Sequence, residues 1–529
     1  MTESSLETMP WDQHPSIYEH ICQHIPAEGP GLNQEGYELP DHEKVNAGKA
    51  IRFAPGALDG VFSHHVSGPD EDQQVHEIAA AVIAYCHQPT AANKRAVYEL
   101  ALNEQILGLI DAVLKAIVSE ASLDGQRLYE LGYSLATESP DREPVKFGIA
   151  LIGIFDWPPH VEVLQALGRH DEFTLFCAVA LTNLTEGSEL ALWELAKSAK
   201  SWGRVQTVER LADTQNPEIK HWLLREGYRN GVLNEYLAYT CAVTGDLLTA
   251  LAAEVVDQPL LDGAGDLLTA LIRGGPAEDM GCYEDGPRAT RLFVDQMMAV
   301  AQSLEHFHAL EEIRNYVRSE TAEWDQLVDF GWTEELRQSI AVDCDAILQR
   351  PMWVTLTEAE LQSDDNGKYF IALSAADSLG IDTWETQVAR VRRDAGNGSN
   401  WYQLATHATD ERIDEVVALA EELLNPNELA TGPGLEMGLG LEWQQHNALE
   451  YVLQELGKFP GHGRQLLLCG LRSPIIRSRN MVATAMDAWG KPLWGHELTV
   501  ALERAIAEEP DEDVRDTLEK LAAGEPLDD

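Results

Sequence analysis

Residues 498–521 read LTVALERAIAEEPDEDVRDTLEKL. Leu498 and Leu502 are one helical turn apart, and further apolar residues keep this spacing on both sides of Pro510 as far as Leu518 and beyond. Proline removes a backbone N–H and fits only the first turn of a helix, so Pro510 interrupts the pattern. The stretch therefore predicts two amphipathic helices joined by a tight turn.

A similar pattern recurs upstream, in which a polar residue and a proline precede an apolar–basic pair. The instances are Ser139-Pro140 before Val145-Lys146, Asn216-Pro217 before Ile219-Lys220, Ser473-Pro474 before Ile476-Arg477, and Glu509-Pro510 before Val514-Arg515. Asn and Ser side chains can accept hydrogen bonds from the first free amides of a helix. Asn216-Pro217 and Ser473-Pro474 therefore predict helix starts.

These paired helices resemble a HEAT-type repeat, in which two antiparallel helices form a unit and the second opens with an Asp or Pro turn and an apolar–Arg step. The resemblance covers about residues 460–524 and, less fully, 135–245. It implies an all-α fold, a right-handed alpha-alpha superhelix (an alpha-solenoid) of HEAT-like helix pairs with a loop-rich N-terminal segment. It also implies a scaffold for binding, without fixing any chemistry.

The positions of prolines and of helical periodicity along the chain predict the domain organisation. Seven prolines interrupt the first 70 residues, and helical periodicity begins near residue 71. Met352 to Thr357 looks extended because it is rich in β-branched residues. We expect a loop-rich segment over 1–70, helical repeats over 71–275 and 290–350, an irregular insertion over 351–400, and HEAT-like repeats over 401–529.

The chain is strongly acidic. Its 529 residues include 88 Asp and Glu against 38 Lys and Arg, a formal net charge of -50. Such a field repels phosphate and anionic lipid, so we expect neither direct nucleic-acid binding nor membrane binding. A basic protein partner suits the charge, and the simpler alternative is that the charge only maintains solubility.

The cysteines indicate a reducing compartment. There are seven, an odd number, and none forms a C-x-x-C pair. The N-terminus has no apolar signal core, and the longest apolar run, 147–155, is too short to span a bilayer. We therefore expect a cytoplasmic protein.

Histidines are concentrated near the N-terminus, where eight of the 17 lie in the first 90 residues. His20 and His24 are one helical turn apart, and Asp59, His64 and His65 form a second group. Imidazole and carboxylate are ligands for zinc or iron, so a metal-dependent enzyme is the alternative function. Ordinary surface or loop histidines are the simpler interpretation, and then no cofactor is expected.

Aromatic residues are dense between 193 and 239. The candidate binding residues are Trp193, Trp202, Trp222, Tyr228 and Tyr236. Exposed Trp and Tyr dominate binding interfaces, although Trp is also common between stacked helices. The sequence therefore predicts a non-enzymatic protein that binds a basic protein partner through an acidic surface, as an adaptor or as an inhibitor or immunity protein.

Overall fold

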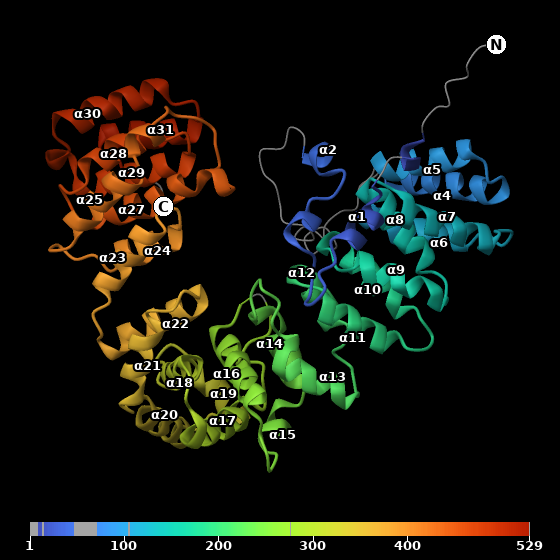
Figure 1. Ribbon diagram of the computed structural model, residues 1–529, viewed down its shortest axis with the longest axis horizontal. Coiled ribbons are helices and arrows are strands. Elements are labelled where there is room, and N and C mark those ends of the chain that lie inside the picture. The colour runs from blue at the N-terminus through green and yellow to red at the C-terminus, as the bar shows by residue number, and fades with distance from the viewer. Residues whose placement is uncertain (1–8, 13–14, 47–70, 104–105, 276, 528–529) are drawn as a thin grey trace. The chain divides into compact units, whose positions relative to one another are not determined.

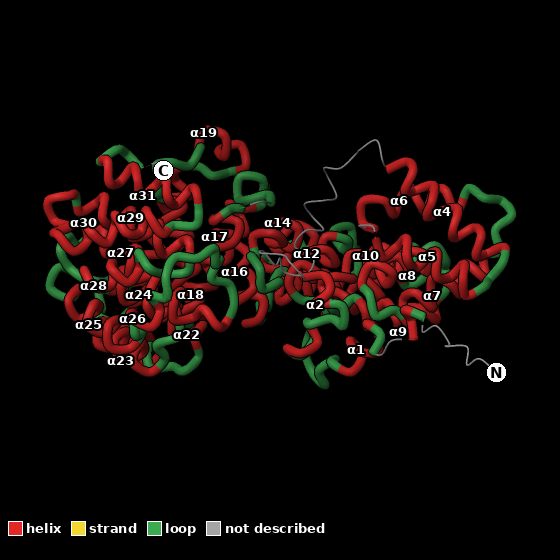
Figure 2. The backbone as a smooth tube through the Cα atoms, turned by 90° about the horizontal axis from the view of Figure 1, so that it is seen from above, coloured by secondary structure: helices red, strands yellow, loops and turns green. Residues whose placement is uncertain are grey.

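The computed structural model describes residues 9–12, 15–46, 71–103, 106–275 and 277–527. Helix accounts for 71% of these residues, and no strand occurs among them. Figure 2 accordingly shows helices joined by loops. The expected all-α class is confirmed. Contacts divide the chain into two compact units, residues 1–353 and 354–529, and each is described by itself.

The first unit contains most of the helices labelled in Figure 1. They are α1 (Ile17–Gln23), α2 (His42–Asn46), α4 (Glu71–His87), α5 (Ala91–Asn103), α6 (Ile106–Val118), α7 (Gly125–Glu138), α8 (Arg142–Ile152), α9 (Val161–Leu167), α10 (Asp171–Thr182), α11 (Ser188–Ser198), α12 (Ser201–Glu209), α13 (Pro217–Trp222), α14 (Glu235–Thr244), α15 (Leu247–Leu251), α16 (Gln258–Arg273), α17 (Gly286–Val300), α18 (Leu304–Val317), α19 (Trp324–Leu327) and α20 (Glu334–Leu348). A π-helical turn, η4 (Leu223–Gly227), follows α13 directly.

Alternate helices of this unit pack in chain order. Each of α8, α10, α12, α14, α16, α18 and α20 contacts the next member of that series, while α9 and α11 contact each other, as do α15 and α17. Each of these contacts buries an apolar stripe of the two helices that it joins. The helices thus form consecutive packed pairs.

The N-terminal segment packs onto these rows. Ile17 N–H donates to the carbonyl of Ser139 (2.9 Å), and Gly31 N–H donates to the carbonyl of Ser198 (2.7 Å). Asp41 receives the guanidinium of Arg142 at 3.0 Å. Short helices α1 and α2 are therefore fixed by contacts with α7 to α12 that lie far away in the sequence.

The second unit has its own core. Its helices are α21 (Met352–Glu360, which spans the boundary), α22 (Asn366–Leu379), α23 (Trp384–Arg393), α24 (Gly398–Thr406), α25 (Ile413–Leu423), α26 (Pro426–Leu429), α27 (Gln444–Glu455), α28 (Arg464–Gly470), α29 (Ile476–Trp489), α30 (Lys491–Glu508) and α31 (Glu512–Ala523). Here α24, α27, α29 and α31 pack in order, and α26, α28 and α30 form a second row.

The expected extended structure at Met352–Thr357 is wrong, because α21 covers it. Trp353 and Thr357 are both fully buried while Thr355 between them is exposed, a pattern that fits helical spacing and not the alternation of a strand. The Trp353 indole also donates to the carbonyl of Ile347 (2.8 Å). Tertiary packing overrides the β-propensity of this stretch.

The two helix starts predicted from Asn216-Pro217 and Ser473-Pro474 both have a helix nearby, but only the first begins at the predicted residue. Asn216 caps α13, its side chain accepting from Glu218 N–H. At Ser473-Pro474 the helix begins two residues later than expected, because Ser473 Oγ accepts from Ile475 N–H (3.2 Å) and closes a turn first. Ile475 is consequently the fully buried residue, and Ile476 is only partly buried.

Candidate functional site

The predicted aromatic residues form two pairs in α11 to α14. Trp193 and Trp222 meet edge to face at 6.4 Å, and Trp202 meets Tyr236 in the same way at 5.1 Å. All four side chains are half-buried. Each pair joins residues from different helices, so the fold assembles them at the surface of one unit.

Basic groups already cover part of the first pair. Lys197 Nζ lies 4.1 Å from the Trp193 ring centre, and the Arg204 guanidinium lies 5.4 Å from that of Trp222. Arg204 is buried, and burial lowers its pKa. Its guanidinium donates to the carbonyl of Ala199 (3.2 Å), which fixes it beneath the rings.

Tyr228 differs from the other four. It is fully buried, and its hydroxyl donates to Asp266 Oδ2 at 2.6 Å. Burial, followed by the Asp266 charge, raises the pKa of this phenol. Tyr228 thus belongs to the core that supports the aromatic pairs.

The π-helical turn η4 separates Trp222 from Tyr228, which lie at its two ends. It is contacted by α16, where Gly263 lies so close that a β-carbon there would be 2.0 Å from the carbonyl oxygen of Leu224. Only glycine permits this approach. Single π-turns of this kind occur frequently at functional sites.

The two N-terminal histidines of the metal hypothesis lie close together, His20 within α1 and His24 as the residue that caps its C-terminal end. Their ring centres are 4.3 Å apart, and His24 Nε2 is 3.8 Å from Glu35 Oε2. His20 Nε2 is buried without a hydrogen-bond partner among the described residues. Burial, and then the neighbouring His24, lowers the pKa of His20.

The other members of that hypothesis, Asp59, His64 and His65, lie outside the described residues. Within the described ranges, no group of three or more His, Cys, Asp or Glu side chains is arranged to hold a metal ion. The structure therefore brings together two imidazoles of the predicted set.

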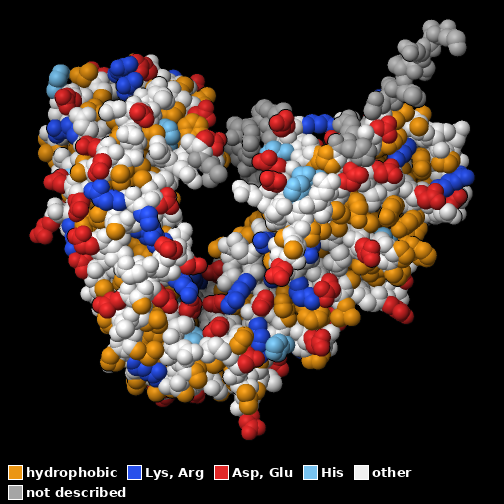
Figure 3. Space-filling model, viewed as in Figure 1, with side chains coloured by type: hydrophobic (Ala, Val, Ile, Leu, Met, Phe, Trp, Pro, Cys, Tyr) orange, Lys and Arg blue, Asp and Glu red, His pale blue; other side chains and the backbone are white. Residues whose placement is uncertain are grey.

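An acidic surface surrounds α19 and the start of α20. Its six exposed carboxylates are Glu320, Glu323, Asp325, Asp329, Glu334 and Glu335, and no Lys or Arg lies between them in the sequence. Of the flanking cations, Arg318 pairs with Asp345. Arg337 stacks 4.2 Å from the ring centre of Trp324 in α19, so one guanidinium lies against this surface. On the face seen in Figure 3, by contrast, acidic and basic side chains are interspersed.

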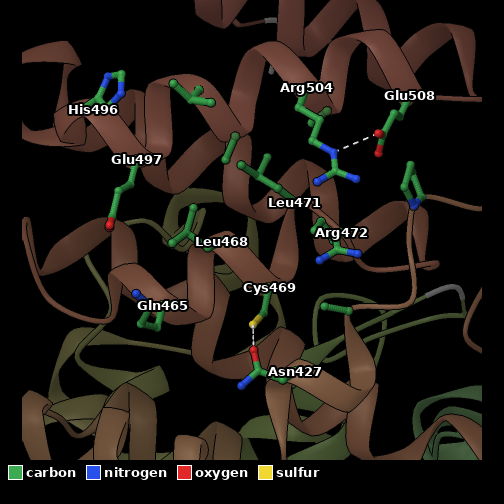
Figure 4. A pocket seen from close by; sticks show the side chains of 15 residues that line it. Asn427, Gln465, Leu468, Cys469, Leu471, Arg472, His496, Glu497, Arg504 and Glu508 are labelled. Carbon is green, nitrogen blue, oxygen red and sulfur yellow. Dashed lines mark hydrogen bonds and ion pairs between the residues drawn. The ribbon is translucent and has the colours of Figure 1, made fainter.

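The second unit contains a pocket that the sequence interpretation missed. It measures about 540 Å³ and lies between α28, α30 and the segment 427–433. Figure 4 shows the Arg472 and Arg504 side chains at one end, with His496 and Glu497 at the other. The available sequence signal was a local excess of basic residues between 458 and 504.

No family model matches this chain, and no curated protein matches its sequence. Of the helices in the described ranges, none combines the length and the apolar character needed to cross a membrane.

Proposed function

We propose that this chain is a non-enzymatic helical-repeat protein that binds a basic protein partner, as an adaptor or as an inhibitor. The ordered packing of alternate helices supports a HEAT-like superhelix, which typically presents an extended binding face. We also propose that this superhelix is right-handed.

The acidic surface is the observation that carries the proposal. Six exposed carboxylates with no Lys or Arg between them in the sequence outnumber the one guanidinium, Arg337, that stacks on α19, so the local charge and the field it creates are negative. Such a field attracts a basic surface before contact and increases the rate of association. Because exposed charges are screened within about 8 Å at physiological salt, that rate should depend strongly on ionic strength.

The half-buried aromatic pairs would supply the short-range apolar contacts with the partner, which charges do not provide. Trp and Tyr offer large, rigid apolar area with a polar edge, which suits a binding interface. Trp193 and Trp202 keep part of their surface exposed. Dissociation should therefore depend on these rings more than on salt.

The test begins with capture of partners from the source cell at low salt, followed by association rates across an ionic-strength series. A variant that neutralises part of the acidic surface combines Glu320→Gln, Glu323→Gln, Glu334→Gln and Glu335→Gln. The matched control removes the same charge from scattered exposed positions: Asp111→Asn, Glu186→Gln, Glu254→Gln and Glu519→Gln.

We expect the acidic-surface variant to associate about tenfold more slowly at low salt, and the control to stay within about twofold, because steering depends on local charge. Equal effects in both variants would mean that only the overall charge matters. An acidic partner, or a rate indifferent to salt, would refute the proposal.

The second candidate, a metal-dependent enzyme, rests on the adjacent imidazoles of His20 and His24. Elemental analysis of protein purified without a histidine tag addresses it directly. Stoichiometric zinc or iron that disappears in a His20→Ala, His24→Ala double variant would replace the binding proposal with this one.

A further inference from the structure

The charge balance reverses locally in the second unit. Between residues 458 and 504 there are seven basic residues, Lys458, Arg464, Arg472, Arg477, Arg479, Lys491 and Arg504, and three acidic ones, Asp487, Glu497 and Glu503. In a chain with more than twice as many acids as bases, such a reversal identifies a region that can accept an anion.

Five of these cations are engaged within the protein. They pair as Lys458 with Glu455, Arg464 with the Leu493 carbonyl, Arg477 with Glu450, Arg479 with Glu509, and Lys491 with the Ala522 carbonyl. Arg472 and Arg504 are different. The exposed Arg472 side chain has no hydrogen-bond or ion-pair partner in the described part of the chain.

Arg504 is only weakly engaged. Its Nε lies 2.8 Å from Glu508 Oε1, but the two side chains are 58% and 44% exposed, and exposed pairs of this kind stabilise little. Its guanidinium can therefore exchange Glu508 for another anion, or bind both.

The two guanidinium groups project into the same end of the pocket (Figure 4). The neighbouring wall is apolar, formed by Leu468 of α28 and by Val500 and Ala501 of α30. Val500 is 46% exposed, so part of this apolar wall is open to solvent. The pocket thus combines an end with two guanidinium groups, which outnumber the single Glu508 carboxylate there, and an uncovered apolar wall.

We propose that this pocket binds a small amphipathic organic anion. Its carboxylate or phosphate head contacts Arg472 and Arg504, and its short alkyl body lies on Leu468, Val500 and Ala501. Guanidinium groups bind planar or tetrahedral oxyanions bidentately. The volume of about 540 Å³ is within the usual range of small-ligand sites. This site is independent of the proposed protein partner.

Isothermal titration calorimetry on the full chain tests the proposal with defined probes. Octanoate carries both features, acetate lacks the alkyl body, octan-1-ol lacks the charge, and octyl phosphate changes the head group. We expect octanoate or octyl phosphate to bind at least about tenfold more tightly than acetate or octan-1-ol, since each lost feature removes a factor of about ten. The tighter of the two anions identifies the head group.

Three variants locate the site. Arg472→Gln with Arg504→Gln should weaken binding of the preferred anion about tenfold or more, and Ala501→Phe should do the same by filling the pocket without changing charge. Arg392→Gln is the matched control, because Arg392 is an exposed arginine paired with Glu422 outside the pocket. Melting curves establish that each variant is folded.

Absence of binding by both anions would overturn the proposal. Equal binding of octan-1-ol, or an Arg392→Gln variant weakened as much as the pocket variants, would also overturn it.

Discussion

Arg479 and Glu509 form a fully buried ion pair among the last helices. The guanidinium contacts both carboxylate oxygens, at 2.7 and 2.6 Å, and also donates to the carbonyls of Ser473 and Gly434 at 2.8 Å each. Removing one partner leaves an uncompensated buried charge. We predict that Arg479→Met lowers the free energy of unfolding by about 3–5 kcal/mol, measured by urea denaturation.

The exposed pair of Arg392 and Glu422 provides the control. Arg392→Gln should cost less than about 1 kcal/mol, because water solvates both charges. If Arg479→Met cost no more than Arg392→Gln, the buried pairing described above would be incorrect.

His170 is a buried histidine held in its neutral form. Its Nε2–H donates to the carbonyl of Tyr37 (3.3 Å), and its Nδ1 accepts from Glu172 N–H (3.2 Å). Burial lowers the pKa of His170 to about 4. The unfolded state therefore binds more protons between pH 6.5 and 4, and stability is lost as pH falls through this window.

We predict that His170 contributes a loss of about 3 kcal/mol between pH 6.5 and 4, since each pKa unit corresponds to about 1.4 kcal/mol. Carboxylates titrate in the same window, so the comparison is with His170→Gln, whose stability should fall less steeply. His76→Gln, at an exposed position of α4, is the control and should follow the unchanged protein. Parallel pH profiles for all three would contradict the prediction.

At the scale of elements, the contact of α16 with the π-turn η4 depends on Gly263. A β-carbon there would be 2.0 Å from the Leu224 carbonyl oxygen, so the two elements would have to separate. We predict that Gly263→Ala destabilises the protein by about 2 kcal/mol or more, as overpacking does. Tryptophan fluorescence should also change, because Trp222 borders the turn.

Gly108→Ala is the control for this prediction. No atom lies within 4 Å of a β-carbon at Gly108 in α6, so the substitution should stabilise by about 0.5–1 kcal/mol through helix propensity. A Gly263→Ala variant as stable as Gly108→Ala would show that the helices are not in close contact.

The sequence predicted which segments form helices better than it predicted the residue at which each helix begins. Periodicity and proline punctuation locate α13, α30 and α31, because those signals are local. The start of α29 two residues later than expected depends on how Ser473 closes its turn, which no helical pattern specifies. Met352–Thr357 is helical and not extended for a similar reason, since burial of Trp353 against residues distant in the sequence, such as Phe307, determines its conformation.

The candidate sites also divide into features that local sequence indicates and features that depend on contacts between distant residues. The aromatic residues were identifiable from composition, whereas the burial of Tyr228 depends on Asp266, 38 residues away. The pocket was not identifiable, because Asn427, Arg472 and Arg504 come from separate segments. Only folding brings them to one surface.

At the scale of the whole molecule, the second unit should fold without the first. Its core cluster consists of residues from Trp384 to Leu521 and includes none from the first unit. We predict that a fragment spanning 363–529 gives a helical circular dichroism spectrum and a cooperative thermal transition. The matched fragment 363–475 lacks α29 to α31 and should not show that transition. A disordered longer fragment would contradict the division.

The buried ion pair also affects how the chain is synthesised. The ribosome delivers Arg479 before Glu509, and 30 residues separate them. Until the later residue emerges, the guanidinium has no carboxylate and α29 cannot be buried at low energy. A nascent chain therefore completes the second unit only after Glu509 has emerged, and messages truncated before the codon for Glu509 would yield a product with an unpaired Arg479 that chaperones and proteases can distinguish from the folded unit.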